Sequence, residues 1–209
     1  MTTRIIQPTF VTSLPKWNDT GLDPLPQICV AGRSNVGKSS LINAVVGQGI
    51  ARTSSTPGRT QALVVFSVKA RREEVTIPFH LVDLPGYGFA KVPLEMKQSW
   101  RPMMLSFFKG NSRLKGCLML LDIRRTPSTD DMELLEMMGE EGVPVLPIIT
   151  KIDKVPKTQR PRELKKIAAA IHVEASSLRV VSVHEKIGLE ELAGDLFEAV
   201  VEDDRCSDQ

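Results

Sequence analysis

The stretch Gly32-Arg-Ser-Asn-Val-Gly-Lys-Ser39 decides the fold of this chain, because it matches the phosphate-binding pattern G-x-x-x-x-G-K-[ST]. An apolar, strand-like segment, residues 28–31, precedes the match, and a helix-length segment, residues 38–46, follows it. Glycines in such a loop let backbone N–H groups turn inward around phosphate oxygens at a helix N-terminus, where the helix dipole favours anions. A glycine turn beside a solvated lysine is the alternative, but the flanking strand and helix favour a phosphate-binding loop.

Each residue type in this loop suits one part of a nucleoside triphosphate. We expect Lys38 to place its ammonium group on the β- and γ-phosphates, which is a catalytic role, and Ser39 to give its hydroxyl to Mg²⁺. The other residues of this stretch that are expected to bind the nucleotide are Gly32, Arg33, Ser34, Asn35, Val36, Gly37 and Ser40.

A second motif, Asp83-Leu-Pro-Gly86, follows the strand-like segment 75–82. A carboxylate in this position can hold Mg²⁺ through water, and the Gly86 N–H can donate to a γ-phosphate. Asp83 is therefore a predicted metal ligand, and Gly86 is a predicted catalytic residue. The motif alone is also a common turn, but its place at a strand end downstream of the loop indicates a nucleotide switch.

The third motif, Thr150-Lys-Ile-Asp153, closes the strand-like segment 143–149. The Asp153 carboxylate can accept hydrogen bonds from the N1–H and the N2 amino group of guanine, whereas adenine offers no such pair of donors. Lys151 can lay its aliphatic stem over the base, and Thr150 is expected to bind the nucleotide with them. An N-cap aspartate beside exposed lysines is the simpler interpretation of this motif alone. With two phosphate motifs upstream, the sequence predicts guanine recognition.

Two weaker signals complete the predicted site. Thr60, just before the strand-like segment 62–68, is the better candidate for a second Mg²⁺ hydroxyl with a catalytic role, and Thr56 is the alternative. Ser182 and Val183, at the end of the last strand-like segment, offer a backbone N–H for the guanine O6. An ordinary Ser/Thr loop and an ordinary strand end are the competing interpretations.

Segments with strand and helix character alternate along the chain, which is typical of an α/β fold. Strands are expected at residues 28–31, 62–68, 75–82, 116–121, 143–149 and 180–183, and helices at residues 38–46, 94–108, 130–140, 159–171 and 189–201. Only a polar turn separates the second strand from the third, so these two should form an antiparallel hairpin. The prediction is a three-layer P-loop NTPase fold, with a mainly parallel six-stranded sheet and one antiparallel edge strand.

Length and composition indicate a single globular domain. The 209 residues carry a formal net charge of +2 and are 42% hydrophobic, and we expect a domain over residues 27–201, a polar N-terminal arm over residues 1–26 and an acidic C-terminal tail over residues 202–209. No apolar run approaches the length of a membrane span. Three cysteines without metal-ligand spacing, and a start without the apolar core of a signal peptide, indicate a cytoplasmic protein.

Together these motifs resemble those of the EngB (YihA/YsxC) family of bacterial GTPases, over roughly residues 27–201. The stretches that carry the resemblance are residues 32–43, 56–61, 83–88, 150–153 and 188–192. The resemblance implies a Ras-like G domain that binds GTP or GDP with Mg²⁺ and hydrolyses GTP to GDP. It also implies a switch in the assembly of the large (50S) ribosomal subunit, linked to bacterial growth and division. Thr150 stands where most GTPases have asparagine, as is usual in this family, and Val183 replaces a small residue.

The residue after the second motif bears on the rate of hydrolysis. Tyr87 stands where Ras-like enzymes have a glutamine that orients the attacking water. A phenol cannot do this in the same way, so intrinsic hydrolysis should be slow. Asn35 matches the asparagine that ligates K⁺ in related GTPases, so stimulation by K⁺ or by a ribosomal partner is expected.

Basic residues gather in two segments that we expect to be exposed. They are Lys97, Arg101, Lys109, Arg113 and Lys115 in the first, and Lys154, Lys157, Arg160, Arg162, Lys165 and Lys166 in the second. Such runs are usually solvated helix faces, but with the family resemblance they indicate contact with rRNA or ribosomal proteins, by a monomer without membrane contact. Two other functions stay open: a GTP-bound placeholder that hydrolysis releases, and an ATP-dependent kinase or ATPase, which the third motif disfavours.

Overall fold

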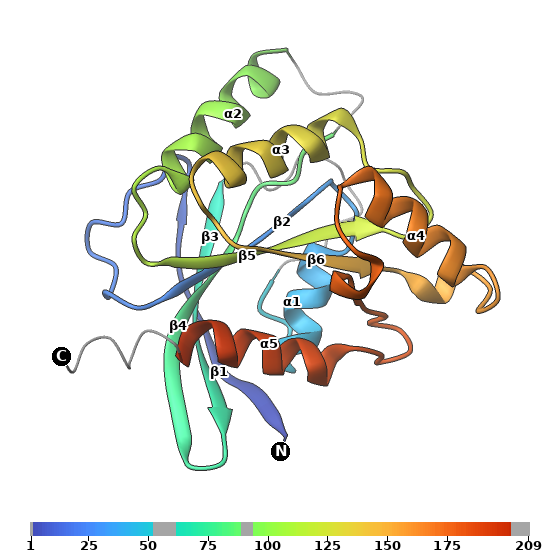
Figure 1. The fold of residues 1–209 in the computed structure, drawn as a ribbon. Helices are drawn as coiled ribbons and strands as arrows, with labels where there is room; N and C mark the ends of the chain where they lie inside the picture. Colours follow the sequence, from blue (N-terminus) through green and yellow to red (C-terminus); the bar gives the residue numbers. More distant parts are fainter. Residues whose placement is uncertain (1, 52–61, 89–93, 202–209) are drawn as a thin grey trace.

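The computed structural model of this chain describes residues 2–51, 62–88 and 94–201. Its centre is a sheet of seven strands in the order β1-β3-β4-β2-β5-β6-β7 (Figure 1). The strands are β1 (Thr3–Leu14), β2 (Gln27–Gly32), β3 (Leu63–Arg72), β4 (Val75–Asp83), β5 (Leu114–Asp122), β6 (Val145–Thr150) and β7 (Arg179–Val180). Pairing is parallel from β4 through β2, β5 and β6 to β7, whereas β3 runs antiparallel to both β4 and β1. The predicted α/β fold with a mainly parallel sheet and an antiparallel β3–β4 hairpin is confirmed. The reversed strand, β3, lies one position inside the edge, because β1 pairs with its other side.

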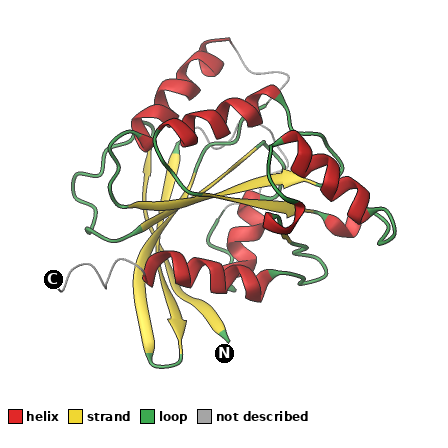
Figure 2. Cartoon of the chain, in the orientation of Figure 1, coloured by secondary structure: helices red, strands yellow, loops and turns green. Residues whose placement is uncertain are grey.

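Helices cover both faces of the sheet (Figure 2). They are α1 (Lys38–Val46), α2 (Leu94–Phe108), α3 (Thr129–Glu140), α4 (Arg160–Ala170) and α5 (Leu189–Val201), with the short 3-10 helices η1 (Ile152–Lys154) and η2 (Ala175–Ser177). Buried side chains of α1 and α5 share one apolar core with the sheet, and those of α2, α3 and α4 share the other. The three predicted layers are therefore present. None of the described helices has the length and apolar character needed to cross a bilayer.

Burial on both faces explains the composition of the central strands. β2 is buried along its whole length, and so are the last six residues of β5. A strand covered by helices on both sides has no solvent face, so it is a continuous apolar run without alternation. Such runs in the sequence were enough to predict the central strands.

The structure corrects the prediction for the N-terminal arm. Within residues 1–26, the segment Thr3–Leu14 is strand β1, which pairs antiparallel with β3, so the sheet has one strand more than the six predicted. The pairing register shifts between Ile6 and Thr9. Pro8 lies at this irregularity, where the missing N–H of proline leaves no hydrogen bond of the ladder unmade. This bulge removes the regular alternation by which a strand is recognised. The predicted tail, residues 202–209, lies outside the described residues.

The topology brings the predicted motifs to one edge of the sheet. β2 ends at Gly32, β4 at Asp83, β5 at Asp122 and β6 at Thr150. These four strands are parallel neighbours, and in registers such as Asp122 opposite Thr150 their last residues lie side by side. Ligands of open α/β sheets bind at the carboxyl ends of the strands, so this edge is where a site is expected.

Candidate functional site

The loop between β2 and α1 has the backbone of an anion-binding loop. Gly32 has a φ of 148°, Asn35 of 60° and Gly37, the N-cap of α1, of 116°. At Gly32 a Cβ would lie 2.8 Å from the carbonyl oxygen of Leu120, so only glycine fits there. No side chain caps the N-terminus of α1. Its first N–H groups therefore have no side-chain acceptor of their own, and the helix dipole favours an anion at that end.

Lys38 lies over this loop. Its Nζ donates a hydrogen bond to the Gly32 carbonyl at 3.3 Å. Burial lowers the pKa of Lys38, and the nearby Asp83 charge raises it in part. Burial disfavours the charged form of this lysine, so a strongly anionic ligand stabilises the ammonium more than it would in bulk water.

Asp83 fits the metal that the motif implies. Only 4% of the residue is exposed, and its Oδ1 has no hydrogen-bond partner among the described residues. Burial raises the pKa of Asp83 to about 6, although Lys38 lowers it in part. Buried polar atoms are seldom left without a partner, and carboxylate and hydroxyl oxygens are the ligands that Mg²⁺ prefers. Asp83 at the end of β4 and Ser39 at the start of α1 are therefore the described residues that could hold Mg²⁺.

The Asp83-Leu-Pro-Gly86 motif contacts the loop directly. A Cβ at Gly86 would lie 3.0 Å from Lys38 Nζ and 3.2 Å from the backbone nitrogen of Ser34. The Ser34 N–H donates to the Tyr87 carbonyl at 2.9 Å. The segment that is expected to detect a γ-phosphate is thus already attached to the phosphate-binding loop.

The phenol of Tyr87 turns toward α3. Its hydroxyl donates to Asp131 Oδ1 at 2.7 Å, and only 6% of the residue is exposed. Asp131 also accepts a hydrogen bond from the Ser128 backbone at 2.7 Å, as part of the capping box that begins α3. Burial, and then the charge of Asp131, raise the pKa of Tyr87 well above its ordinary value. The hydroxyl is neutral and already occupied.

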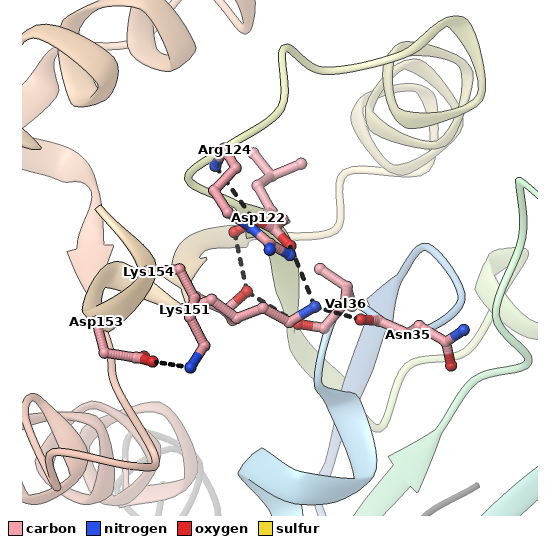
Figure 3. Close-up of polar contacts among 9 residues, drawn as sticks. Asn35, Val36, Asp122, Arg124, Lys151, Asp153 and Lys154 are labelled. Atoms are coloured by element: carbon pink, nitrogen blue, oxygen red, sulfur yellow. Dashed lines mark hydrogen bonds and ion pairs between the residues drawn. The ribbon is translucent and has the colours of Figure 1, made fainter. Parts of the chain in front are cut away.

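Thr150 and Lys151 attach the third motif to the loop, and Figure 3 shows the contacts of Lys151. The Thr150 hydroxyl lies 3.0 Å from the Val36 carbonyl and 3.2 Å from the Leu121 carbonyl. Lys151 has a φ of 59°, and its Nζ donates to the Asn35 carbonyl. The motif predicted to recognise the base is therefore fastened to the motif predicted to bind the phosphates.

Asp153 is held by two donors. Its Oδ1 accepts from the Ser182 hydroxyl at 2.9 Å, and its Oδ2 lies 3.1 Å from Lys154 Nζ. Burial raises the pKa of Asp153, but the hydrogen bonds from Ser182 and Lys154 outweigh it and lower the pKa below its ordinary value. Asp153 is thus an ionised acceptor. The N–H of Ser182 already donates to the Ile187 carbonyl at 3.1 Å, so this N–H is occupied in the structure.

One residue of the site, Asp122 at the end of β5, was not predicted from the sequence. Its Oδ2 lies 2.7 Å from Arg124 Nη2 and 3.1 Å from Lys151 Nζ (Figure 3). Burial raises the pKa of Asp122, but the hydrogen bonds from Arg124 and Lys151 hold it at about 2. The ion pair with Asp122 fixes the ammonium group of Lys151. In the sequence, the feature that could have indicated Asp122 is an aspartate at a strand end, followed by an arginine two positions later.

The structure brings together the predicted residues of the loop, of the second and third motifs and of the Ser182 region. Thr60 and its alternative Thr56 lie outside the described residues, so their role as a magnesium ligand stays a prediction. Val183 lies at the same end of the sheet, and it is 38% exposed.

Comparison with known proteins identifies the class of protein that has this fold and site. Residues 27–151 match a family model described as "50S ribosome-binding GTPase". Two solved structures share the fold: a probable GTP-binding protein EngB, with a TM-score of 0.66 and 23% identity over 84% of this chain and 99% of that one, and a single-residue variant of Aquifex aeolicus Era bound to GDP·AlF4⁻, with a TM-score of 0.66 and 20% identity over 84% of this chain and 57% of that one. The chain is a P-loop GTPase.

Relatives at higher identity define the family. The chain is 44% identical to the probable GTP-binding protein EngB of Trichlorobacter lovleyi, over 95% of this chain and 98% of that protein. It is 46% identical to the protein of the same name from Geobacter sp. strain M21, over 78% and 74% of the two chains. The chain belongs to the EngB family of GTP-binding proteins. The family resemblance expected from the sequence is confirmed.

The buried carboxyl of Asp83 should make the stability of the nucleotide-free, Mg²⁺-free protein depend on pH. Its folded pKa of about 6 lies above the ordinary value of 3.8, so its stabilising contribution is complete below about pH 4 and is lost as the pH rises through 6. We expect the free energy of unfolding to fall by roughly 2–3 kcal/mol from this group between pH 4 and pH 7.

Urea unfolding of the wild type and of Asp83→Asn over this pH range measures the effect. The difference between the two curves isolates Asp83 from other titrating groups. Parallel curves would contradict the assignment of a raised pKa to this carboxyl.

Proposed function

We propose that this GTPase acts as a switch in the assembly of the large (50S) ribosomal subunit, with a link to bacterial growth and division. The match of residues 27–151 to a family described as "50S ribosome-binding GTPase" is the observation that carries the proposal. We further propose that it works in the cytoplasm as a monomer, with residues 27–201 as its nucleotide-binding domain.

The phosphate end of the site is proposed to act as follows. The N–H groups of the loop at the start of α1 bind the α- and β-phosphates, Lys38 binds the β- and γ-phosphates, and the Gly86 N–H donates to the γ-phosphate. Ser39 and Asp83 hold Mg²⁺, which when bound neutralises charge that develops on the phosphate oxygens during in-line attack of water. The buried Asp83 Oδ1 without a partner among the described residues supports this assignment. Thr60 is the proposed second hydroxyl, with Thr56 as the alternative.

The base end is proposed to select guanine. The ionised Asp153 accepts two hydrogen bonds from the base, and the Ser182 hydroxyl, at 2.9 Å from Oδ1, orients the carboxylate. Lys154, whose side chain is 56% exposed, can leave Oδ2 when the base arrives. The Asn35 carbonyl and Asp122 hold the Lys151 ammonium, so the stem of Lys151 has a fixed position beside the base. The N–H at Val183 is the proposed contact to the guanine O6.

Hydrolysis by the isolated protein is proposed to be slow. The hydroxyl of Tyr87 donates to Asp131, so it does not orient water at the γ-phosphate. Asn35 has an exposed side chain on the loop, where its amide oxygen could ligate K⁺ beside the phosphates. The cation would supply positive charge to the transition state. A ribosomal partner is the second proposed source of stimulation.

A basic face of α4 is the proposed contact with ribosomal RNA. Arg162 and Lys165 are exposed, and neither forms an ion pair among the described residues, whereas Lys166 pairs with Glu163. Lys157, between η1 and α4, is also exposed. Unpaired cations that neutralise phosphates release counterions, which strengthens binding and makes it salt-dependent. In the sequence, this face begins a few residues after Asp153.

Asp153→Asn should move base preference from guanine toward xanthine, because an amide can donate to the carbonyl at position 2 of xanthine. We expect GTP affinity to fall at least about a hundredfold, as measured by calorimetry with GTP and XTP. Lys154→Ala is the control, because it removes the other partner of the carboxylate and should leave guanine selectivity unchanged. Unchanged GTP selectivity in Asp153→Asn would refute the assignment of Asp153.

Exchange of Na⁺ for K⁺ should raise the single-turnover rate of GTP hydrolysis roughly tenfold or more, since one positive charge is added at the β- and γ-phosphates. Asn35→Gly should abolish the response, because glycine keeps the left-handed backbone of the loop and removes only the amide. Equal rates in both salts, with and without ribosomes, would contradict a K⁺ site.

Co-sedimentation with ribosomal subunits tests the proposed partner. The protein should sediment with large subunits more strongly with a non-hydrolysable GTP analogue than with GDP, and binding should weaken steeply with salt. The double variant Arg162→Glu/Lys165→Glu should bind roughly tenfold more weakly. Lys69→Glu/Arg71→Glu, on the exposed part of β3, is the matched control.

Absence of binding with either nucleotide would refute the proposed partner. Salt-independent binding would refute the RNA-facing role of α4. Single-turnover hydrolysis with and without large subunits separates a stimulated enzyme from a placeholder, because a placeholder hydrolyses GTP at the same rate in both cases.

A further inference from the structure

We infer that Trp100, on α2, is a positioning residue for the γ-phosphate: its indole N–H holds the peptide unit whose N–H is proposed to bind that phosphate. Trp100 Nε1 donates to the Pro85 carbonyl at 3.4 Å. Through this contact Trp100 favours GTP over GDP. The inference rests on the proposed role of the Gly86 N–H and adds a residue from outside the three nucleotide motifs.

One peptide unit links Trp100 to the phosphate end of the site. The Pro85 carbonyl and the Gly86 N–H belong to the same planar amide, and the described residues contain no cis peptide bond. In a trans amide the C=O and the N–H point in opposite directions. A carbonyl directed at α2 therefore directs the Gly86 N–H away from α2. Rotation of this unit would break the contact with Trp100, so the indole restricts the direction in which the amide can donate.

The same contact makes the amide a better donor. A carbonyl that accepts a hydrogen bond polarises its peptide unit, which strengthens the N–H on the other side, by about 10–30% per bond. A polarised N–H binds a highly charged γ-phosphate oxygen better than an unpolarised one does. Trp100 thus acts on both the direction and the strength of the Gly86 N–H.

The neighbours of this peptide unit leave it little freedom. Gly86 lies against the loop, where a Cβ would meet Lys38 Nζ at 3.0 Å and the Ser34 nitrogen at 3.2 Å. On the next residue, the Tyr87 carbonyl accepts from Ser34 at 2.9 Å. Trp100 adds a restraint on the Pro85 carbonyl from the side of α2.

Trp100 is itself held in place by packing. Its ring centroid lies 5.1 Å from that of Tyr87, with 58° between the ring planes, and the residue is half-buried. Tyr87 is in turn bound to Asp131 of α3 at 2.7 Å. The indole N–H therefore belongs to a packed group of side chains, so the order it imposes on the peptide unit costs little further entropy.

Trp100→Phe tests the inference, because phenylalanine keeps an aromatic ring against Tyr87 and removes the N–H. A typical hydrogen bond contributes about 0.5–1.5 kcal/mol, so we expect affinity for a non-hydrolysable GTP analogue with Mg²⁺ to fall about three- to tenfold. Affinity for GDP, which has no γ-phosphate, should change less than about twofold. Trp17→Phe is the matched control, since Trp17 packs edge-on against Phe107 of the same helix.

The GTP-analogue to GDP affinity ratio decides the outcome. A fall in this ratio for Trp100→Phe alone supports the inference. Equal weakening of both nucleotides shows a merely structural role and overturns it, as does an unchanged ratio. If the wild type binds no guanine nucleotide, the proposed nucleotide site itself fails, and this inference fails with it.

A second measurement is independent of whether Trp100→Phe folds. In Trp17→Phe, Trp100 is the one remaining tryptophan of the sequence, so its fluorescence reports on the indole directly. We expect the GTP analogue to shift the emission and GDP to leave it near the value of the nucleotide-free protein. An identical response to both nucleotides would overturn the inference.

Discussion

The structure depends on one constraint: the loop before α1 must keep a left-handed backbone, and the N-terminus of α1 has no side-chain cap. The loop meets this constraint in two ways. The backbone is left-handed at Asn35 and Gly37, and Gly32 lies close against Leu120. Hydrogen bonds from the surrounding elements then fasten the loop. Ser34 donates to the segment after β4, and Val36 accepts from Thr150 at the end of β6. The parallel sheet has the geometry that makes these contacts possible, because it collects the ends of its strands at one edge.

The site is maintained at a cost in stability. Lys38 and Asp83 both lie where burial disfavours their charged forms, and one oxygen of Asp83 lacks a partner among the described residues. Selection for stability alone would favour apolar or well-solvated side chains at these positions. Strained residues and ionisable groups with shifted pKa values are instead typical of ligand-binding sites. A ligand that binds only the folded state raises the free energy of unfolding. The increase grows with the logarithm of the ratio of ligand concentration to Kd. The folded state of this chain is therefore coupled to nucleotide supply.

The sequence predicted what lies close together along the chain. The loop, the second motif and the third motif are contiguous, and their order identified the fold and the site. Contacts between distant positions were not predictable: Asp122 is placed in the site by its ion pair with Lys151, 29 residues later. Strand β1 was not predicted, because its bulge at Pro8 breaks the alternation with a period of two that indicates a strand. Ser182 was chosen for its backbone, but its side chain makes the contact with Asp153.

The pairing of β1 also determines how the sheet meets other molecules. At one margin of the sheet stands β7, two residues long, and at the other stands β1, whose ladder is interrupted twice. Short or bulged margins give an incoming extended chain no continuous row of N–H and C=O groups to join. Recruitment of this protein by strand addition, and its growth into fibrils by the same route, are thereby disfavoured.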